Sequence, residues 1–523
     1  MKHNRPVLIV GSGPTGMVIA SQLVALGIPV RIIDRLAAPV TTSRAFTIHA
    51  RTLELMGLMD LTDTFLSRSI KTYSMDYHFP GMDDTPKLDF TKLDSVYPFC
   101  LSINQSDTEA ILRDRLTAQG VAIEWQTELV SFESTPDGES ITVSLNRVDT
   151  GATETATVDW LIGCDGIRSI VRQQLALPFD GSEYAGTMRM IDVPLSGFTG
   201  SDTAIHYFVA KDHMLLVNKL PGANYRVLIS DKTEGVPPEQ ARAAFQEVAD
   251  KHFGGQVQIG EPVWATNFRI SRRNTSSYRQ GRVFLAGDAA HANSPAGGQG
   301  MNTAIQDAFN LSWKLAMVLK GEAPSSLLDT YEAERRPVAS QVLAGTNYIH
   351  GMIMAHGQGM QERIDRMRGG EWNRLAVNQV AGIAYTYRNP EDISPALAVG
   401  DRAPDGFLNG SRRMYNLVAK QGYTLFLFVA DVAQSARLAE VVQGFQQKYR
   451  AVITPHLVVS QSLADQLPQS AFSVVVDDGD FAQRYDCAGS DQLFVVRPDY
   501  HIGYRGKTDD HTAMEAYFDT VLL

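Results

Sequence analysis

The chain has 523 residues, of which 44% are hydrophobic and 20% are charged, so it can bury several large cores. This composition excludes disordered, collagen-like and fibrous proteins. The formal net charge is −11, and basic residues cluster at most in pairs such as Arg272-Arg273, so the sequence predicts no nucleic-acid partner.

Cysteine usage and apolar runs indicate the compartment. Cys100, Cys164 and Cys487 are odd in number and far apart, which disfavours both a disulfide framework and a CxxC metal or redox site. No metal site is therefore predicted. The apolar run 7–10 is cut off by glycine, and the run 425–430 is far shorter than the ~20 residues that a membrane span needs. We expect a cytoplasmic protein without a membrane partner.

The N-terminal segment has the pattern strand, glycine loop, helix, strand. Strands are expected at 7–10 and 30–33, and apolar residues have helical spacing over 17–26. The loop after the first strand is a GxGxxG motif, Gly11-Ser12-Gly13-Pro14-Thr15-Gly16. Its glycines allow backbone N–H groups to approach a pyrophosphate, and Asp34 after the second strand can bind a ribose hydroxyl. Together these features predict a dinucleotide site.

The next part of the chain alternates between two patterns. We expect a helix over 106–119, a strand ending near Leu129, and a buried strand over 158–162 that leads into Cys164-Asp165-Gly166. Alternating apolar residues then predict an antiparallel sheet with strands at 188–193, 204–209, 213–219 and 225–230. A buried strand returns at 282–286, so dinucleotide-type segments bracket a β-rich insertion.

A second glycine-rich loop follows this last strand. Asp288 stands at the strand end, and the loop continues as Ser294-Pro295-Ala296-Gly297-Gly298-Gln299-Gly300-Met301-Asn302 into a long helix over about 303–320. Such a loop can present backbone N–H groups to the far end of a long cofactor, for instance a flavin ring that becomes anionic on reduction. The alternative is an ordinary connection with glycine caps.

Beyond Pro337 the chain is expected to be helical to about Met367, and a boundary rich in Gly and Pro follows at 400–406. Strands between helices then predict a small α/β domain, with strands at 423–429, 456–460, 472–476 and 492–496.

These motifs, in this order, resemble the single-component FAD-dependent aromatic hydroxylases (class A flavoprotein monooxygenases). The resemblance covers about 5–340 and rests on both glycine loops, Arg44, 49–54, 104–105, 164–169 and 306–337. It implies an α/β fold: a Rossmann-like FAD-binding domain of the glutathione-reductase type, an inserted β-rich substrate domain, a helical segment and a C-terminal thioredoxin-like domain. The implied boundaries are 1–73, 99–185 and 272–340 for the FAD-binding domain, 74–98 and 186–271 for the substrate domain, 341–399 for the helical segment and 400–523 for the last domain.

The C-terminal block resembles the tail of the phenol hydroxylase and polyketide hydroxylase branches at 402–406 and 496–500. It lacks CxxC, and Cys487 stands alone, so a structural or dimerisation role is favoured over thiol redox chemistry. We expect a monomer or a homodimer.

The resemblance also implies how FAD is held. Residues Gly11 to Gly16 and Arg44 would bind the pyrophosphate, and Asp34, with Arg35 beside it, would bind the adenosine end. The other implied contacts are Gln105 at the ribityl–flavin region, Leu129 at the adenine through its backbone, Asp165 at FAD and the nicotinamide cofactor, Asp288 at the ribityl chain, and Gly298, Gly300, Met301 and Asn302 at the pyrimidine edge.

Catalytic residues are less well defined by the resemblance. Pro295 is implied to place its backbone carbonyl beside the flavin hydroperoxide. The acid–base aspartate of the phenol hydroxylase branch is replaced here by Phe46, so that assignment is not carried over. A phenolic substrate reacts better as phenolate, so a base is expected. The candidates on the insertion, with the first and last favoured, are His206, Tyr207, His213 and Tyr225.

The implied reaction uses NADPH or NADH, molecular oxygen and a small phenolic or polycyclic aromatic substrate, which is hydroxylated. Apolar residues at alternating positions of the insertion predict a pocket for a flat uncharged ring, with Arg226 as the candidate carboxylate clamp. The alternatives are a non-catalytic flavin-binding partner protein, a flavin-dependent halogenase, for which no WxWxIP-like segment is found, and an NAD-dependent dehydrogenase, which leaves the second glycine loop unexplained.

Overall fold

A six-stranded sheet carries the N-terminal part of the computed structural model, which describes residues 5–41, 44–82, 85–183, 186–231, 233, 235–354, 359–408, 412–449, 452–467 and 473–523. Its order is β21 (Arg279–Gln280), β22 (Val283–Leu285), β12 (Trp160–Gly163), β1 (Val7–Val10), β2 (Val30–Ile33) and β8 (Ile123–Glu124). The strands from β22 to β8 are parallel. Every residue of β1 and β12 is buried, as expected for apolar strands covered on both faces.

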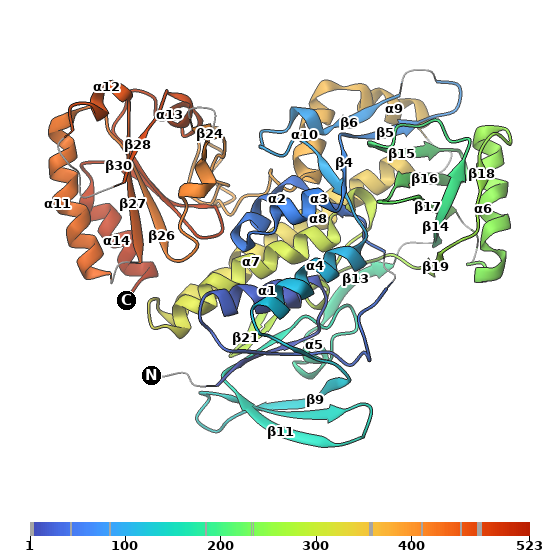
Figure 1. Cartoon of the computed structure of the whole chain (residues 1–523), viewed down its shortest axis with the longest axis horizontal. Coiled ribbons are helices and arrows are strands. Elements are labelled where there is room, and N and C mark those ends of the chain that lie inside the picture. The colour runs from blue at the N-terminus through green and yellow to red at the C-terminus, as the bar shows by residue number, and fades with distance from the viewer. Residues whose placement is uncertain are drawn as a thin grey trace.

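Three helices pack beside this sheet in the centre of the molecule (Figure 1). They are α1 (Pro14–Ala25), α4 (Gln105–Ala118) and α7 (Gly300–Leu319). Almost every residue of α7 is buried, including Asp307 and Lys314, which form ion pairs with Arg335 and Glu334. The two helices that follow the glycine loops, α1 and α7, lie against each other, so both loops open at the same edge of the sheet.

A second, larger sheet contains segments that are distant in sequence. Its order is β18 (Gln258–Ile259), β14 (Thr187–Ser196), β17 (Asn224–Asp231), β16 (Met214–Lys219), β15 (Ala204–Val209), β5 (Ser74–His78) and β6 (Lys87–Asp89), and β19 (Trp264–Phe268) also pairs with β14. The predicted antiparallel sheet is thus present, with one parallel pair between β15 and β5.

Both faces of this sheet are covered. One face packs on α6 (Pro238–Phe253) through Phe245 and a separate apolar cluster. The other face, with Tyr207 and Leu228, packs on residues near the second glycine loop. The sequence prediction missed α6, although Ala241, Phe245 and Val248 have helical spacing and are buried.

Two further boundaries differ from the expected ones. Leu129 lies near the start of β9 (Thr127–Ser134) and not at a strand end. Pro337 lies inside α8 (Asp329–Met354), and two more helices follow, α9 (Met360–Arg368) and α10 (Gly370–Val380).

The C-terminal part contains a five-stranded sheet, in the order β28 (Ser473–Val476), β27 (Ile453–Val459), β26 (Tyr423–Phe428), β29 (Gln492–Val496) and β30 (Ile502–Lys507). It lies beside the N-terminal part of the molecule (Figure 1), where Arg402 donates to the buried carboxylate of Glu54 at 2.6 and 2.9 Å. This mixed α/β architecture confirms the predicted fold class. The thioredoxin-like description, the domain boundaries and the monomer or homodimer stay predictions.

Among the described residues, no helix combines the length and the apolar composition that crossing a membrane requires. Nor do the described residues gather three or more His, Cys, Asp or Glu side chains in a metal-binding arrangement.

Candidate active site

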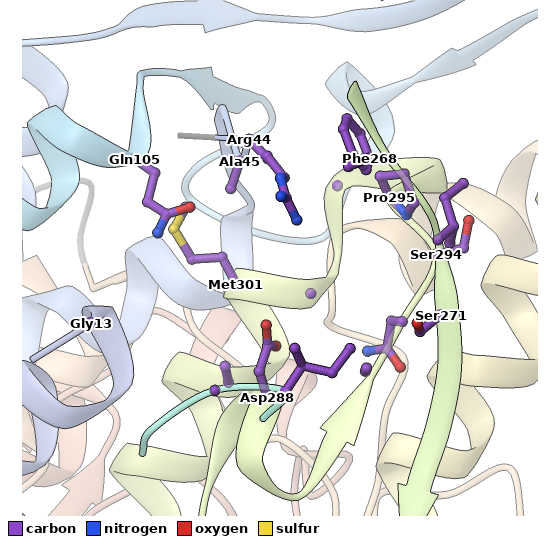
Figure 2. A pocket seen from close by; sticks show the side chains of 18 of the residues that line it. Gly13, Arg44, Ala45, Gln105, Phe268, Ser271, Asp288, Ser294, Pro295 and Met301 are labelled. Atoms are coloured by element: carbon purple, nitrogen blue, oxygen red, sulfur yellow. The ribbon is translucent and has the colours of Figure 1, made fainter. Parts of the chain in front are cut away.

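One cavity of about 520 Å³ lies between the two glycine loops and the large sheet (Figure 2). Its wall is built from segments far apart in the chain: 13–15, 44–47, 105, 164, 166–167, 228, 268–271, 288, 292–295, 298, 300–301 and 304. Figure 2 shows Gly13 at one end of the cavity and Ser271, Ser294 and Pro295 at the other. Polar groups thus occur at both ends, and apolar side chains of the large sheet, including Leu228 and Phe268, supply part of the wall.

The three glycines of the first loop are required for different reasons. Gly11 has φ +103°, and a Cβ there would lie 2.4 Å from the carbonyl oxygen of Cys164. A Cβ on Gly16 would lie 2.0 Å from the carbonyl oxygen of Gly11. A Cβ on Gly13, in contrast, would meet no protein atom within 4 Å, and Gly13 lines the cavity. The space in front of Gly13, at the N-terminus of α1, suits the close approach of a phosphate group.

Asp34 lies behind this loop. Its carboxylate accepts from the backbone N–H and the hydroxyl of Ser12, both at 2.8 Å, and from the N–H of Leu36 at 3.0 Å. Its carbonyl accepts from Thr127 at 2.9 Å, which places the start of β9 beside it. Leu129 is buried on that strand, and Arg35 is exposed. None of the predicted adenosine contacts lines the cavity itself.

Arg44, Gln105 and Asp288 point toward the middle of the cavity (Figure 2). The guanidinium of Arg44 lies 4.9 Å from the centre of the Phe268 ring. Gln105 donates to Glu109 at 2.8 Å. Asp288 is exposed to the open cavity, and His291 and Arg44 place opposing charge near its carboxylate.

The second glycine loop is held tightly by side chains. Gly298 has φ +65°, and a Cβ there would lie 2.1 Å from the hydroxyl of Thr47. The amide of Asn302 donates to the carbonyls of Thr47 and Gly298 at 2.9 and 2.8 Å and accepts from the N–H of His49 at 2.9 Å. The loop ends at Gly300, the first residue of α7, so Met301 and the helix N-terminus face the cavity.

This arrangement fits an elongated dinucleotide with a flat ring at one end. Two helix N-termini and Arg44 can bind negative charge, and the open face of Gly13 leaves room for a pyrophosphate. A family model described as an FAD binding domain matches residues 4–346. The chain belongs to this FAD-binding family.

Relatives in the family match nearly the whole chain. Pentachlorophenol 4-monooxygenase of Sphingobium chlorophenolicum is 37% identical over 527 residues, 99% of this chain and 96% of that protein. For 6-methylpretetramide 4-monooxygenase of Streptomyces rimosus the identity is 40% over 542 residues, with coverage of 99% and 93%. The solved structure of the OxyS anhydrotetracycline hydroxylase from Streptomyces rimosus matches with a TM-score of 0.78 and 28% identity, over 99% of both chains. These comparisons confirm the predicted class, an FAD-dependent aromatic monooxygenase, over the alternatives.

Two aspartates support the FAD site without lining the cavity. Asp165 accepts from the N–H of Ile170 at 2.7 Å at the start of α5 (Ile170–Gln174), while its neighbours Cys164 and Gly166 line the cavity. Asp307, on α7, accepts from the N–H of Gly287 at 3.1 Å, and His291 and Arg335 contact the same carboxylate at 2.6 and 2.7 Å. No role was predicted for Asp307, although it lies in the segment 306–337, on which the family resemblance rests in part.

The predicted catalytic bases do not reach the cavity. His206 is buried, with its ring nitrogens 3.0 Å from His78 and from the carbonyl of Ser201. Tyr225 donates to Asp202 at 2.8 Å. Both pack against Phe198 and therefore belong to the face that is covered by α6. Neither His206 nor Tyr225, the two favoured candidates for the base, is among the described residues that line the cavity.

His213 and Tyr207, the other two candidates for the base, also contact protein groups outside the cavity. His213 contacts Asp212 at 2.7 Å and His252 at 2.9 Å. Tyr207 is on the cavity side of the sheet but is buried in a stack with Tyr77.

Arg226 is not a free carboxylate clamp. It is buried and forms two hydrogen bonds of 2.8 Å with Asp192, its cross-strand neighbour on β14. It also donates to the carbonyls of Arg44 and Ala45, each at 3.1 Å. Arg226 therefore fastens the sheet to the segment that carries Arg44.

Proposed function

We propose that the protein uses NADPH or NADH and O₂ to hydroxylate a phenolic or polycyclic aromatic ring. The observation that carries this proposal is the single cavity shared by the two glycine loops and the large sheet, which brings a cofactor site and an apolar wall together. The wall contains Leu228, Phe268 and Ile270, which suit a flat ring. The relatives named for pentachlorophenol and 6-methylpretetramide support an aromatic substrate.

In this proposal the residues that hold FAD have defined tasks. The loop 11–16 and Arg44 bind the pyrophosphate of FAD, Asp34 its adenosine ribose, and Gln105 and Asp288 its ribityl region. The N-terminus of α7 faces the pyrimidine edge, where its positive end favours negative charge. FAD held by these residues would supply the redox chemistry, in which the nicotinamide cofactor is the hydride donor, one atom of O₂ goes to the ring and the other leaves as water.

The residues at the ring end orient the substrate and assist loss of its hydroxyl proton. Among the described residues that line the cavity, none is a histidine or a tyrosine. Arg44 and Arg269 place positive charge at the cavity, which favours a phenolate over a phenol. The carbonyl of Pro295 accepts from Gly298 at 2.9 Å and keeps a second lone pair for a hydroxyl group in the cavity.

The test is a coupled assay on the purified protein. We expect a yellow protein that releases FAD on denaturation, and NAD(P)H oxidation that depends on an aromatic substrate and yields one equivalent of hydroxylated product. A panel of phenols, hydroxyquinones and benzoates identifies the substrate class. Oxidation of NAD(P)H that yields only hydrogen peroxide with every compound would contradict the hydroxylase proposal.

A further inference from the structure

The turn 497–501 between β29 and β30 reaches from the C-terminal sheet into the N-terminal part. Arg497 and Asp499 form an ion pair of 2.7 Å, and Arg497 also binds the carboxylate of Glu334 on α8 at 2.6 and 2.8 Å. Asp499 accepts from the amide of Asn310 on α7 at 3.3 Å. The side chains of Arg497 and Asp499 are at most 10% exposed, so the turn is built into the N-terminal part.

Tyr387 connects this turn to the residues behind the cofactor loops. Its ring stacks on the imidazole of His501, with the ring centres 4.1 Å apart and the planes at 27°. The guanidinium of Arg497 lies 5.3 Å from the centre of the same ring. The hydroxyl of Tyr387 accepts from Arg335 on α8 at 3.1 Å. Two residues of the turn thus fix the ring, and the ring fixes the hydroxyl beside Arg335.

Arg335 and Asp307 continue the connection as far as the cavity. Arg335 donates to Asp307 at 2.7 Å and to the carbonyl of Thr303 at 3.2 Å, so it holds the N-terminal half of α7. Asp307 accepts from the backbone N–H of Gly287 at 3.1 Å. The next residue, Asp288, lines the cavity. A series of direct contacts therefore leads from the C-terminal turn to a wall of the cofactor site.

The carboxylate of Asp307 makes this connection sensitive to its partners. One of its oxygens bonds Arg335, and the other bonds Gly287 and His291. Because a carboxylate is planar and rigid, a movement of Arg335 that turns one oxygen also moves the other relative to the N–H of Gly287. The side chains of Arg335 and Asp307 are at most 1% exposed, so bulk water does not replace a contact that is lost.

We propose that Tyr387 is a positioning residue for FAD binding, through which the docked turn 497–501 holds Gly287 and Asp288 in place. Tyr387, Arg335 and His501 do not line the cavity, so they act through Asp307 and not by touching the cofactor. The inference rests on the FAD contacts of the proposed function. It gives the C-terminal motif at 496–500 a task that needs no thiol chemistry.

The first test is Tyr387→Phe in the full chain, which keeps the stacked ring and removes the hydroxyl. FAD affinity is measured by titrating the apoprotein and following flavin fluorescence. We expect binding to weaken about 2- to 30-fold, the range for residues that couple to a site without touching the ligand. Hydrogen exchange of the apoprotein is the second readout: the segment 287–302 should exchange faster than in the wild type, and β1 should change less.

Tyr415→Phe is the matched control. Tyr415 stacks on Tyr500 of the same turn with the ring centres 3.9 Å apart, and its hydroxyl donates to the carbonyl of Ala403 at 2.6 Å. The same substitution there removes one hydrogen bond beside the turn but none between the turn and Gly287. FAD affinity and exchange of 287–302 should stay at the wild-type level, even where urea unfolding shows that the variant is less stable.

His501→Leu tests whether the turn itself acts on Tyr387, because it removes the stacked imidazole. We expect FAD binding to weaken within the same range. The double variant with Tyr387→Phe should bind FAD no more weakly than the weaker of the two single variants, since both changes interrupt one connection. His501→Asn is the second variant, in case the leucine variant does not fold.

The outcomes separate the positioning role from the proposed function. An unchanged FAD affinity in Tyr387→Phe, or an equal loss in Tyr415→Phe, overturns the positioning role. If the affinity is unchanged but 287–302 exchanges faster, the connection exists and the FAD contact of Asp288 in the proposed function is wrong as well. Additive losses in the double variant overturn the link to the turn. If the expected losses are seen and the wild type hydroxylates no aromatic compound, the positioning role stands and only the hydroxylase proposal fails.

Discussion

Replacing Gly13 by alanine separates the cofactor contact from the stability of the fold. Gly13 has φ −67° and ψ 177°, an extended conformation open to any residue, and its added Cβ would touch no protein atom within 4 Å. The apoprotein should therefore keep its free energy of unfolding or gain about 0.4–1 kcal/mol, because alanine restricts the unfolded chain more than glycine does.

The same methyl group occupies the space that a pyrophosphate needs in order to reach the backbone. Overpacking of this kind costs about 1–3 kcal/mol, which corresponds to FAD binding weakened roughly 5- to 150-fold. Gly16→Ala is the opposite control. Its Cβ would lie 2.0 Å from a backbone oxygen of Gly11, so it should destabilise the apoprotein by about 3 kcal/mol or more.

The assay is a titration of apoprotein with FAD, followed by flavin fluorescence, together with urea unfolding of both apoproteins. Wild-type FAD affinity in Gly13→Ala would refute the assignment of this loop to the pyrophosphate. A destabilised Gly13→Ala apoprotein would refute the argument that the space before Gly13 is free.

Three further outcomes follow from contacts described above. Arg44→Ala should weaken FAD binding by about 1–3 kcal/mol through loss of a charge-assisted contact, and an unchanged affinity in an FAD titration would remove Arg44 from the site. Cys487→Ser should leave turnover within a few-fold of wild type, because burial raises the thiol pKa to about 12, and a loss on the order of 100-fold would contradict this. Arg402→Met should lower the free energy of unfolding by about 3–5 kcal/mol at pH 7, because Glu54 is left buried without its main partner. Burial raises the pKa of Glu54, but Arg402 and the other partners of Glu54 lower it to about 2. The stabilisation by the Arg402–Glu54 pair is therefore present above pH 4.5 and is lost as the pH falls toward 2. Urea unfolding of the wild type and of Arg402→Met, from pH 7 down toward pH 2, measures how the difference between their free energies of unfolding decreases.

Local sequence predicted the strands that position the cofactor loops. The bounds of β1 and β2 match the expectation: β1 is an apolar run that ends at Gly11, and β2, in which Arg31 is the one charged residue, ends before Asp34. The glycine loops were recognisable from glycine spacing after a strand, although the groups that crowd Gly11 and Gly298, Cys164 and Thr47, are distant in the chain. The bounds of β15 and β29 also match the expected strands.

The face that each strand turns to the cavity was not predictable in this way. Alternation identifies a strand with two faces, but both faces of the large sheet are apolar: Ile205 faces the cavity side, whereas Leu215 faces α6. Alternation alone therefore could not tell that His206 lies on the face covered by α6. The role of Asp307 was missed for a different reason, since its partners Gly287 and Arg335 are distant in sequence.

The cavity wall has a consequence for how the protein is made. Gly13 leaves the ribosome early, but Asp288, Asn293 and Met301 of the opposite wall are synthesised much later. A nascent chain that ends before α7 therefore lacks half of the FAD site, and capture of the cofactor has to follow synthesis of this helix. Since a ligand that binds only the folded state stabilises it, FAD acts on the finished N-terminal part and not on its precursors.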